Sequence, residues 1–221
     1  MFESQKADSI PSKAVIAELG QMGREFGLSY NVHLPTDIFI SDRNSERQKI
    51  ALETMARTID RVNPLDPSAL ILHLPYCEKS FSDPDVRNWQ NRVFQNLSKL
   101  ISAVQSNKII AIETLEYPLE MLENIILELD LSICLDLGHL MVYDHDVLDV
   151  FEQYNSRTSV LHLHGVENGH DHLALERLSD KLFEPALVIL NKFIGVVSLE
   201  VFSFENLVAS LKYLECHWKK N

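Results

Sequence analysis

The sequence predicts an α/β protein whose parallel strands curl into a barrel. Short apolar runs alternate with stretches of helical periodicity along all 221 residues. The runs are continuously apolar, as is typical of strands that helices cover on both faces. Each run also ends on a histidine or a carboxylate. Because the carboxyl ends of barrel strands open onto one shared mouth, we expect these polar side chains to converge there.

The strands are predicted by the position and length of the apolar runs. They cover residues 28–34, 69–73, 109–113, 132–136, 158–162 and 195–201. Together with a stub at residues 1–4, they predict a (β/α) TIM-type barrel that is N-terminally incomplete, since eight strands complete such a barrel. An open barrel leaves strand edges unpaired, and these edges favour a homo-oligomer.

The helices are predicted by apolar residues that recur every three or four positions. These stripes begin near Val15, Leu52, Val86, Leu122, Val147, Leu182 and Phe204. Ser82-Asp83-Pro84 offers cap residues and a proline suited to a first turn, whereas Pro185 is expected to kink or interrupt its helix. No linker, low-complexity tract or charge block divides the chain, so residues 1–221 are predicted to form a single domain.

The composition argues against several classes of protein. A formal net charge of -12 and a pI near 5.1, without a cluster of basic residues, argue against nucleic acid as a partner. No apolar stretch reaches the roughly 20 residues that span a bilayer, and the N-terminus lacks a signal-peptide core. The three cysteines lack CxxC spacing, which favours a reducing compartment. We therefore expect a cytoplasmic protein without a membrane partner.

The polar strand ends have the composition of a site for several metal ions. Glu113, Asp136 and Glu200 each directly follow an apolar run, and few Lys or Arg residues lie nearby to neutralise them. Buried carboxylates need such a partner, so a metal ion is the simpler explanation. Imidazoles end the remaining strands at His33, His73 and His162, and two more follow at His139, three residues after Asp136, and at His164, two residues after His162.

Several of these residues have a structural alternative that the sequence leaves open. A single histidine after an apolar run is usually structural, and Asp136 is also a suitable helix cap, with Gly138 permitting a tight turn. Of His162 and His164, His162 is the better candidate for a metal ligand. His164 is expected either to contact the ligands without binding the metal or to face the substrate. In the polar loop Gly169-His170-Asp171-His172, His170 is equally well explained as an exposed turn residue.

The order of these residues resembles the xylose isomerase-like barrels, and within them the endonuclease IV branch of apurinic-site endonucleases with three zinc ions. The phrases FES, VHLP, LHLP, ETLE, LDLGH, LHLHG, DHL and LEVFS further resemble the cobamide remodeling phosphodiesterases of that branch. The resemblance implies metal ligation by His33, His73, Glu113, Asp136, His139, His162, His172 and Glu200. In the polar loop, His170 stands where the family pattern has an aspartate, two residues before its histidine.

The resemblance implies a hydrolase that cuts a small-molecule phosphodiester, namely the nucleotide loop of adenosylated corrinoids. Two or three divalent ions, zinc or manganese, would be its cofactors, and Glu113 and Glu200 its catalytic carboxylates. His164, His170 and Glu116 are then expected to contact substrate, with Glu3 as a weaker candidate.

Two other functions remain open. Glu113, Asp136, His162 and Glu200 also match the one-metal site of a ketose isomerase or epimerase, in which two glutamates move a proton. A truncated barrel that binds without catalysis is the third possibility.

Overall fold

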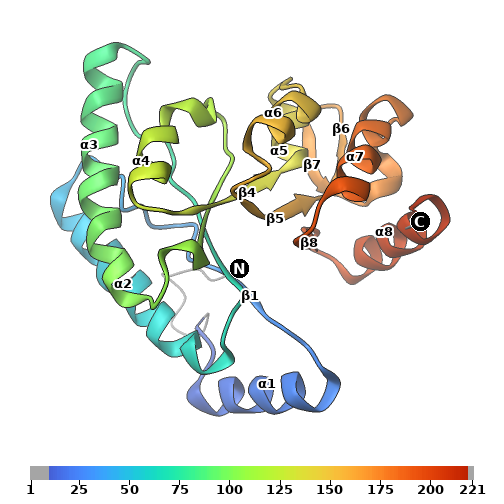
Figure 1. The fold of residues 1–221 in the computed structure, drawn as a ribbon, viewed down its shortest axis with the longest axis horizontal. Helices are drawn as coiled ribbons and strands as arrows, with labels where there is room; N and C mark the ends of the chain where they lie inside the picture. Colours follow the sequence, from blue (N-terminus) through green and yellow to red (C-terminus); the bar gives the residue numbers. More distant parts are fainter. Residues whose placement is uncertain (1–9, 219–221) are drawn as a thin grey trace. The chain divides into compact units, whose positions relative to one another are not determined.

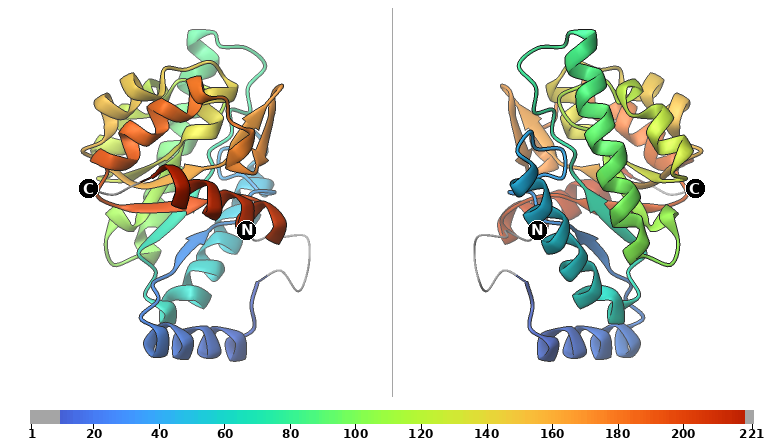
Figure 2. Two further views of the ribbon diagram at one scale, coloured as in Figure 1. Left: turned by 90° about the vertical axis from the view of Figure 1, so that its right-hand side faces the viewer. Right: turned by 90° about the vertical axis from the view of Figure 1, so that its left-hand side faces the viewer.

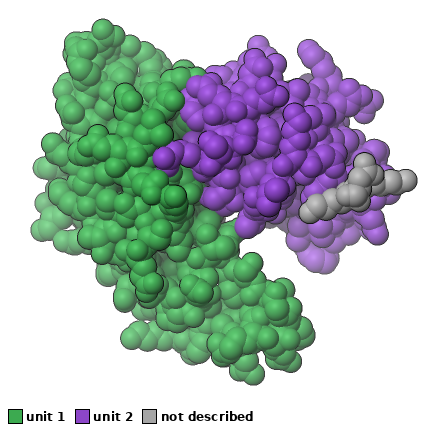
Figure 3. Space-filling model, viewed as in Figure 1, with its two compact units in different colours: residues 1–113, 117–132 green, residues 114–116, 133–221 purple. Residues whose placement is uncertain are grey.

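The computed structural model describes residues 10–218, and the chain forms two compact units. Unit 1 comprises residues 1–113 and 117–132, and unit 2 comprises residues 114–116 and 133–221 (Figure 3). The expected strand stub at residues 1–4, which includes Glu3, lies outside the described residues. Both units contain parallel strands joined by helices (Figure 1).

Unit 1 contains three parallel strands in the order β1-β2-β3. They are β1 (Asn31–His33), β2 (Ala69–Leu72) and β3 (Ile110–Glu113). β2 and β3 are buried at every position, which explains why their sequences are apolar without alternation. The register pairs His33 with Ile71. His33 and Glu113 are the last residues of their strands, and His73 directly follows β2.

The unit 1 helices are α1 (Lys13–Phe26), α2 (Ser45–Val62), α3 (Asp83–Leu100) and the short α4 (Glu123–Glu128). The side chains of Ser12 and Asn44 cap α1 and α2. Pro84 lies in the first turn of α3 as expected, although the Ser82 side chain makes no capping hydrogen bond. The predicted α3 stripe is buried at Trp89, Val93, Leu97 and Leu100.

Unit 2 contains β4 (Ser132–Asp136), β5 (Thr158–Leu163) and β8 (Val196–Leu199), which are parallel in this order; Ser132 itself belongs to unit 1. The register pairs Asp136 with His162 and His162 with Ser198. The helices are α5 (Leu137–Val142), α6 (Val147–Tyr154), α7 (Asp180–Lys192) and α8 (Phe204–His217). Pro185 lies inside α7 without interrupting it. It is the sixth residue, so its missing N–H removes one bond near the start of the helix.

Unit 2 differs from the sequence-based expectation in two places. α5 follows β4 without an intervening loop. The expected polar loop at residues 169–172 belongs instead to an antiparallel hairpin of β6 (Gly165–Glu167) and β7 (His170–Leu173), drawn in orange in Figure 2. Its turn residues Asn168 and Gly169 both have positive φ, at 53° and 77°. Asn-Gly is the usual sequence of such a turn.

The fold is therefore of the predicted α/β class. Within residues 10–218, helical segments follow each of six parallel strands, with the β6–β7 hairpin inserted after β5. This is the repeat of a TIM-type barrel short of its eight strands. In this part of the chain, no helix combines the length and apolar character needed to cross a membrane.

Candidate metal centre

A first cluster of ligand-type side chains lies at the carboxyl ends of the unit 1 strands. Its members are His33, His73 and Glu113, whose candidate ligand atoms lie within 4.8 Å of one another. Glu113 Oε2 is 3.0 Å from His33 Nε2 and 2.9 Å from His73 Nε2. The Glu113 side chain is wholly buried, so these imidazoles, rather than water, are close enough to interact with its charge.

The hydrogen bond of His33 to the backbone determines which of its ring nitrogens carries the proton and which presents a lone pair to Glu113. His33 Nδ1 lies 2.8 Å from the Leu34 carbonyl oxygen. A carbonyl can only accept, so Nδ1 carries the ring proton. In the neutral ring, the Nε2 lone pair then faces a carboxylate oxygen at 3.0 Å. Either a second ring proton or a metal ion must therefore lie between these two atoms, and the orientation of the ring is that of a metal-ligating histidine.

A second cluster lies within unit 2, where β4 meets α5. Ligand atoms of Asp136, His139, His164 and His172 lie within 4.8 Å of one another. Asp136 Oδ1 accepts a hydrogen bond from the His139 backbone N–H at 2.8 Å and thereby caps α5. Its second oxygen, Oδ2, lies 3.5 Å from His139 Nδ1. Asp136 is therefore a helix cap and is also placed as a ligand, so the two interpretations are compatible.

His139 is oriented in the same way as His33. Its Nδ1 lies 3.1 Å from the Thr114 carbonyl oxygen, which also belongs to unit 2. Nδ1 therefore donates to this carbonyl, and Nε2 keeps a lone pair for a metal ion.

His162 and Glu200 extend the second cluster. His162 Nδ1 lies 2.8 Å from Glu200 Oε2 and 3.7 Å from Asp136 Oδ2. Glu200 directly follows β8, and its Oε2 is also 3.8 Å from His172 Nε2. Asp136 thus belongs to two groups of candidate ligands, one that contains His139 and one that contains His162 and Glu200.

The electrostatics of unit 2 keep the carboxylates of Asp136 and Asp171 charged. Burial by itself raises the pKa of Asp136, but the nearby imidazoles of His162, His164 and His139 outweigh burial and hold that pKa well below its usual range. For His172, burial lowers the pKa, whereas the carboxylates of Glu200 and Asp171 raise it to about 9. In the metal-free protein, the site therefore contains an ionised Asp136 and a His172 that is held protonated by Glu200 and Asp171.

The donor set fits divalent metal ions. His73 Nε2 and Asp136 Oδ2 are buried and make no hydrogen bond with any of the described residues. Leaving such atoms unpaired in the interior costs free energy, which coordination to a cation would recover. Imidazole and carboxylate ligands suit zinc and manganese among other metals.

Three residues expected to contact substrate lie in different surroundings. His164 is wholly buried among the ligands of unit 2. His170, at the start of β7, and Glu116 are exposed and belong to neither cluster. In the hairpin, His172 lies in the cluster, and Asp171 Oδ1 is 2.9 Å from His172 Nδ1.

Two features of this site have no counterpart in the sequence reasoning. His172 adopts a left-handed backbone conformation with φ of 53°, which is uncommon for a side chain of this kind. The ring of Phe202, two residues after Glu200, stacks on the His172 ring with centroids 4.5 Å apart and remains 67% exposed. No local sequence signal indicates either feature, because both depend on segments that lie far apart in the sequence.

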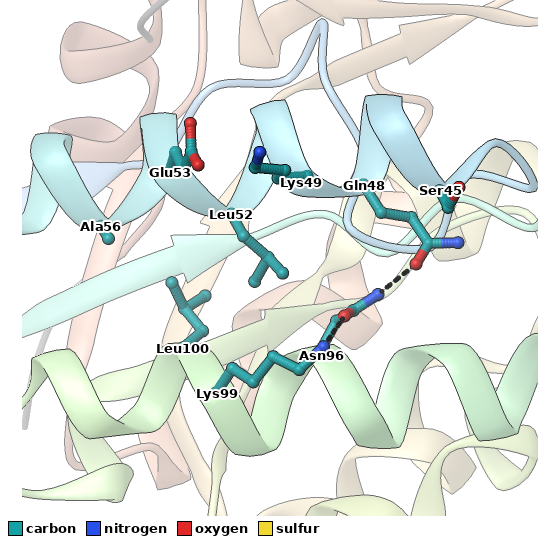
Figure 4. Close-up of a pocket in the computed structure, with 9 residues that line it drawn as sticks. All are labelled: Ser45, Gln48, Lys49, Leu52, Glu53, Ala56, Asn96, Lys99 and Leu100. Carbon is teal, nitrogen blue, oxygen red and sulfur yellow. Dashed lines mark hydrogen bonds between the residues drawn. The ribbon is translucent and has the colours of Figure 1, made fainter.

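A groove elsewhere in unit 1 is unrelated to the metal ligands. It lies between α2 and α3, has a volume of about 560 Å³ and is lined by residues such as Leu52, Ala56 and Leu100 (Figure 4). The Asn96 amide donates to Gln48 Oε1 at 3.0 Å at one end of the groove. Its lining contains no histidine, so we do not assign it to the metal centre.

Comparison with known proteins defines the class to which the chain belongs. The model of the xylose isomerase-like TIM barrel family matches residues 1–216. The chain is therefore a member of this family, which confirms the predicted superfamily. No curated protein matches the sequence.

Solved structures similar to this chain include enzymes of different kinds. A D-tagatose 3-epimerase-like protein superposes with a TM-score of 0.77 at 20% identity, covering 92% of this chain and 82% of the other. Endonuclease IV from Thermus thermophilus gives 0.72 at 16% identity, covering 93% and 81%. The IOLI protein with a binding zinc atom gives 0.70 at 14% identity, covering 100% and 88%. At these identities, the similarity establishes the fold alone.

Proposed function

We propose that this chain is a metal-dependent phosphodiesterase that acts on a small-molecule phosphodiester. The observation that carries the proposal is the number of histidines gathered around the carboxylates. A one-metal isomerase site would use Glu113, Asp136, His162 and Glu200. Beyond that set, His33 and His73 lie against Glu113 in unit 1, and His139 and His172 lie close to Asp136 in unit 2. This surplus of imidazoles supports more than one metal ion.

Divalent ions held by these clusters would supply Lewis-acid activation of a phosphodiester and of the attacking water. The residues of the chain contribute fixed ligand orientations. The Leu34 and Thr114 carbonyls orient the rings of His33 and His139, and the capping bond from the His139 N–H holds Asp136. Such preorganisation lowers the cost of assembling a charged transition state.

For the substrate, we propose the nucleotide loop of an adenosylated cobamide, cut into cobinamide phosphate and the riboside of the lower-ligand base. Motifs such as VHLP, LDLGH and LEVFS, which resemble those of cobamide remodeling phosphodiesterases, support this choice. The net charge of -12 favours a small or amphipathic substrate over a nucleic acid.

A sugar epimerase is the second candidate. The 2.8 Å contact between His162 Nδ1 and Glu200 Oε2 favours an epimerase, because a glutamate held beside a candidate metal ligand is suited to moving a proton. The epimerase fold of one structural relative agrees with this alternative.

Metal content and turnover test the proposal together. Mass spectrometry should find two or three ions per reconstituted chain, and His33→Gln and His139→Gln should each lower this number. The control His217→Gln, an exposed histidine on α8 outside both clusters, should leave it unchanged. The wild type should hydrolyse an adenosylated cobamide. One ion or none in active protein contradicts the proposal, and turnover of a ketose without phosphodiester hydrolysis supports the epimerase.

A further inference from the structure

His164 differs from His33 and His139 in what its Nδ1 atom meets. The backbone N–H of His172 points at His164 Nδ1 at 2.9 Å. A backbone amide can only donate, so this nitrogen must present a lone pair. The Gly165 carbonyl oxygen lies 3.3 Å from the same nitrogen, but an unprotonated nitrogen cannot donate to it. The proton of the neutral His164 ring therefore lies on Nε2.

The protonated nitrogen of His164 faces Asp136. His164 Nε2 lies 3.1 Å from Asp136 Oδ1, and both side chains are wholly buried. The N–H is not aligned as in a short hydrogen bond, but its positive end still attracts the carboxylate strongly at this distance in a dry interior. A nitrogen that carries a proton has no lone pair for a metal ion. Ligation through Nε2 would require an imidazolate.

The surroundings of His164 hold this orientation. Its ring stacks on the His172 ring with centroids 4.3 Å apart and planes 12° from parallel. On the side of α5, a Cβ at Gly138 would come within 2.0 Å of His164 Cε1, so the ring lies directly against the helix backbone. The imidazole is thus packed between the β6–β7 hairpin and the first turn of α5.

We propose that His164 is a positioning residue of the metal centre and not one of its ligands. Its Nε2–H orients Asp136, and its Nδ1 holds the left-handed backbone of His172 on β7. The metal ligands of this cluster are then Asp136, His139 and His172. The inference deepens the proposed function and rests on its metal-binding part.

Nuclear magnetic resonance of protein loaded with cadmium-113 tests the inference directly. In protein labelled with nitrogen-15 histidine, His164 should keep its Nε2 proton and show no coupling to cadmium, whereas His139 Nε2 should show coupling. Coupling of either His164 nitrogen to cadmium overturns the inference while leaving the proposed function intact. A wild type that binds no metal overturns both.

Two amide variants separate the roles of the two nitrogens. His164→Asn places its amide oxygen near the Nδ1 position, and His164→Gln places its amide nitrogen near the Nε2 position. Both should keep the wild-type number of metal ions and bind them about 10- to 100-fold more weakly, as is usual when a group that orients a ligand is lost. His164→Gln should bind more tightly than His164→Ala, because it retains a donor for Asp136. Loss of one complete metal equivalent in both amide variants contradicts the positioning role.

Discussion

Replacement of Gly138 by alanine would place a methyl group against the His164 ring. Gly138 is the second residue of α5 and is buried. The added Cβ would lie 2.0 Å from His164 Cε1 and 2.4 Å from both ring nitrogens, well inside the roughly 3.5–4.0 Å of a normal carbon contact. Because His164 is wholly buried, its ring cannot move aside without losing its own contacts.

The structure corrects the role that the sequence suggested for Gly138. It was expected to permit a tight turn, but the residue lies inside a helix and is not among the glycines with positive φ, Gly27 and Gly169. A glycine is needed here because the imidazole approaches the backbone closely.

The expected change in stability combines three effects. Alanine is better than glycine inside a helix by about 1 kcal/mol. Overpacking costs about 1–3 kcal/mol. If the His164 ring is displaced, the part-buried His172 N–H loses its acceptor, which costs about 1–3 kcal/mol more. The expected net loss for Gly138→Ala is therefore about 1–5 kcal/mol by this reasoning.

Urea unfolding measures this loss, with Gly20→Ala as the matched control. Gly20 lies inside α1, where an added Cβ would meet its nearest atoms at 3.6 and 3.9 Å, so alanine should stabilise this helix by up to about 1 kcal/mol. In the double variant with His164→Ala, the two losses should not add, because the clash has been removed. Equal stability of Gly138→Ala and Gly20→Ala would refute the close-packing explanation.

Three further predictions concern charge and metal. Chelation should lower the melting temperature and added zinc should restore it, since a ligand at 100 times its Kd stabilises by about 2.7 kcal/mol; no shift in scanning fluorimetry would count against a metal site. The pKa of His172 rises to about 9 through Glu200 and Asp171 despite burial. In metal-free protein, the stability that protonated His172 contributes should be complete below about pH 6.5 and lost as the pH rises through 9. Over this pH range, the melting temperature of the wild type should therefore fall more steeply than that of His172→Gln. The Glu78 carboxylate is 4% exposed and pairs with Arg92; Glu78→Gln should lower the free energy of unfolding by about 1–3 kcal/mol in urea titrations, and an unchanged value would show that the pair contributes nothing.

Much of the fold could be predicted from local sequence. The apolar runs located all six parallel strands of the described residues, and 132–136 matches β4 at both ends. The prediction succeeded because buried parallel strands are apolar at every position, so their pattern does not depend on register. The least accurate boundaries were those of the first and last strands, predicted as 28–34 and 195–201 but observed as Asn31–His33 and Val196–Leu199.

The hairpin β6–β7 was missed for a different reason. Its Asn168-Gly169 turn is a recognised hairpin signal, but the flanking segments are three and four residues long and rich in polar side chains. Strands this short show no reliable alternation of apolar and polar residues. Their pairing is stabilised by contacts such as that of the His172 N–H with His164.

The sequence by itself determined the α/β class, the family and the kinds of side chain at the strand ends, because these follow from apolar periodicity and from motifs. The tertiary structure decided what each imidazole does. His33 donates from Nδ1 to the Leu34 carbonyl, whereas His164 accepts at Nδ1 from the His172 backbone. The same residue type after the same kind of apolar run therefore presents a lone pair in one place and a proton in the other. The reason is physical: a neutral imidazole carries one ring proton, and the partner that the fold brings to one nitrogen determines the state of the other.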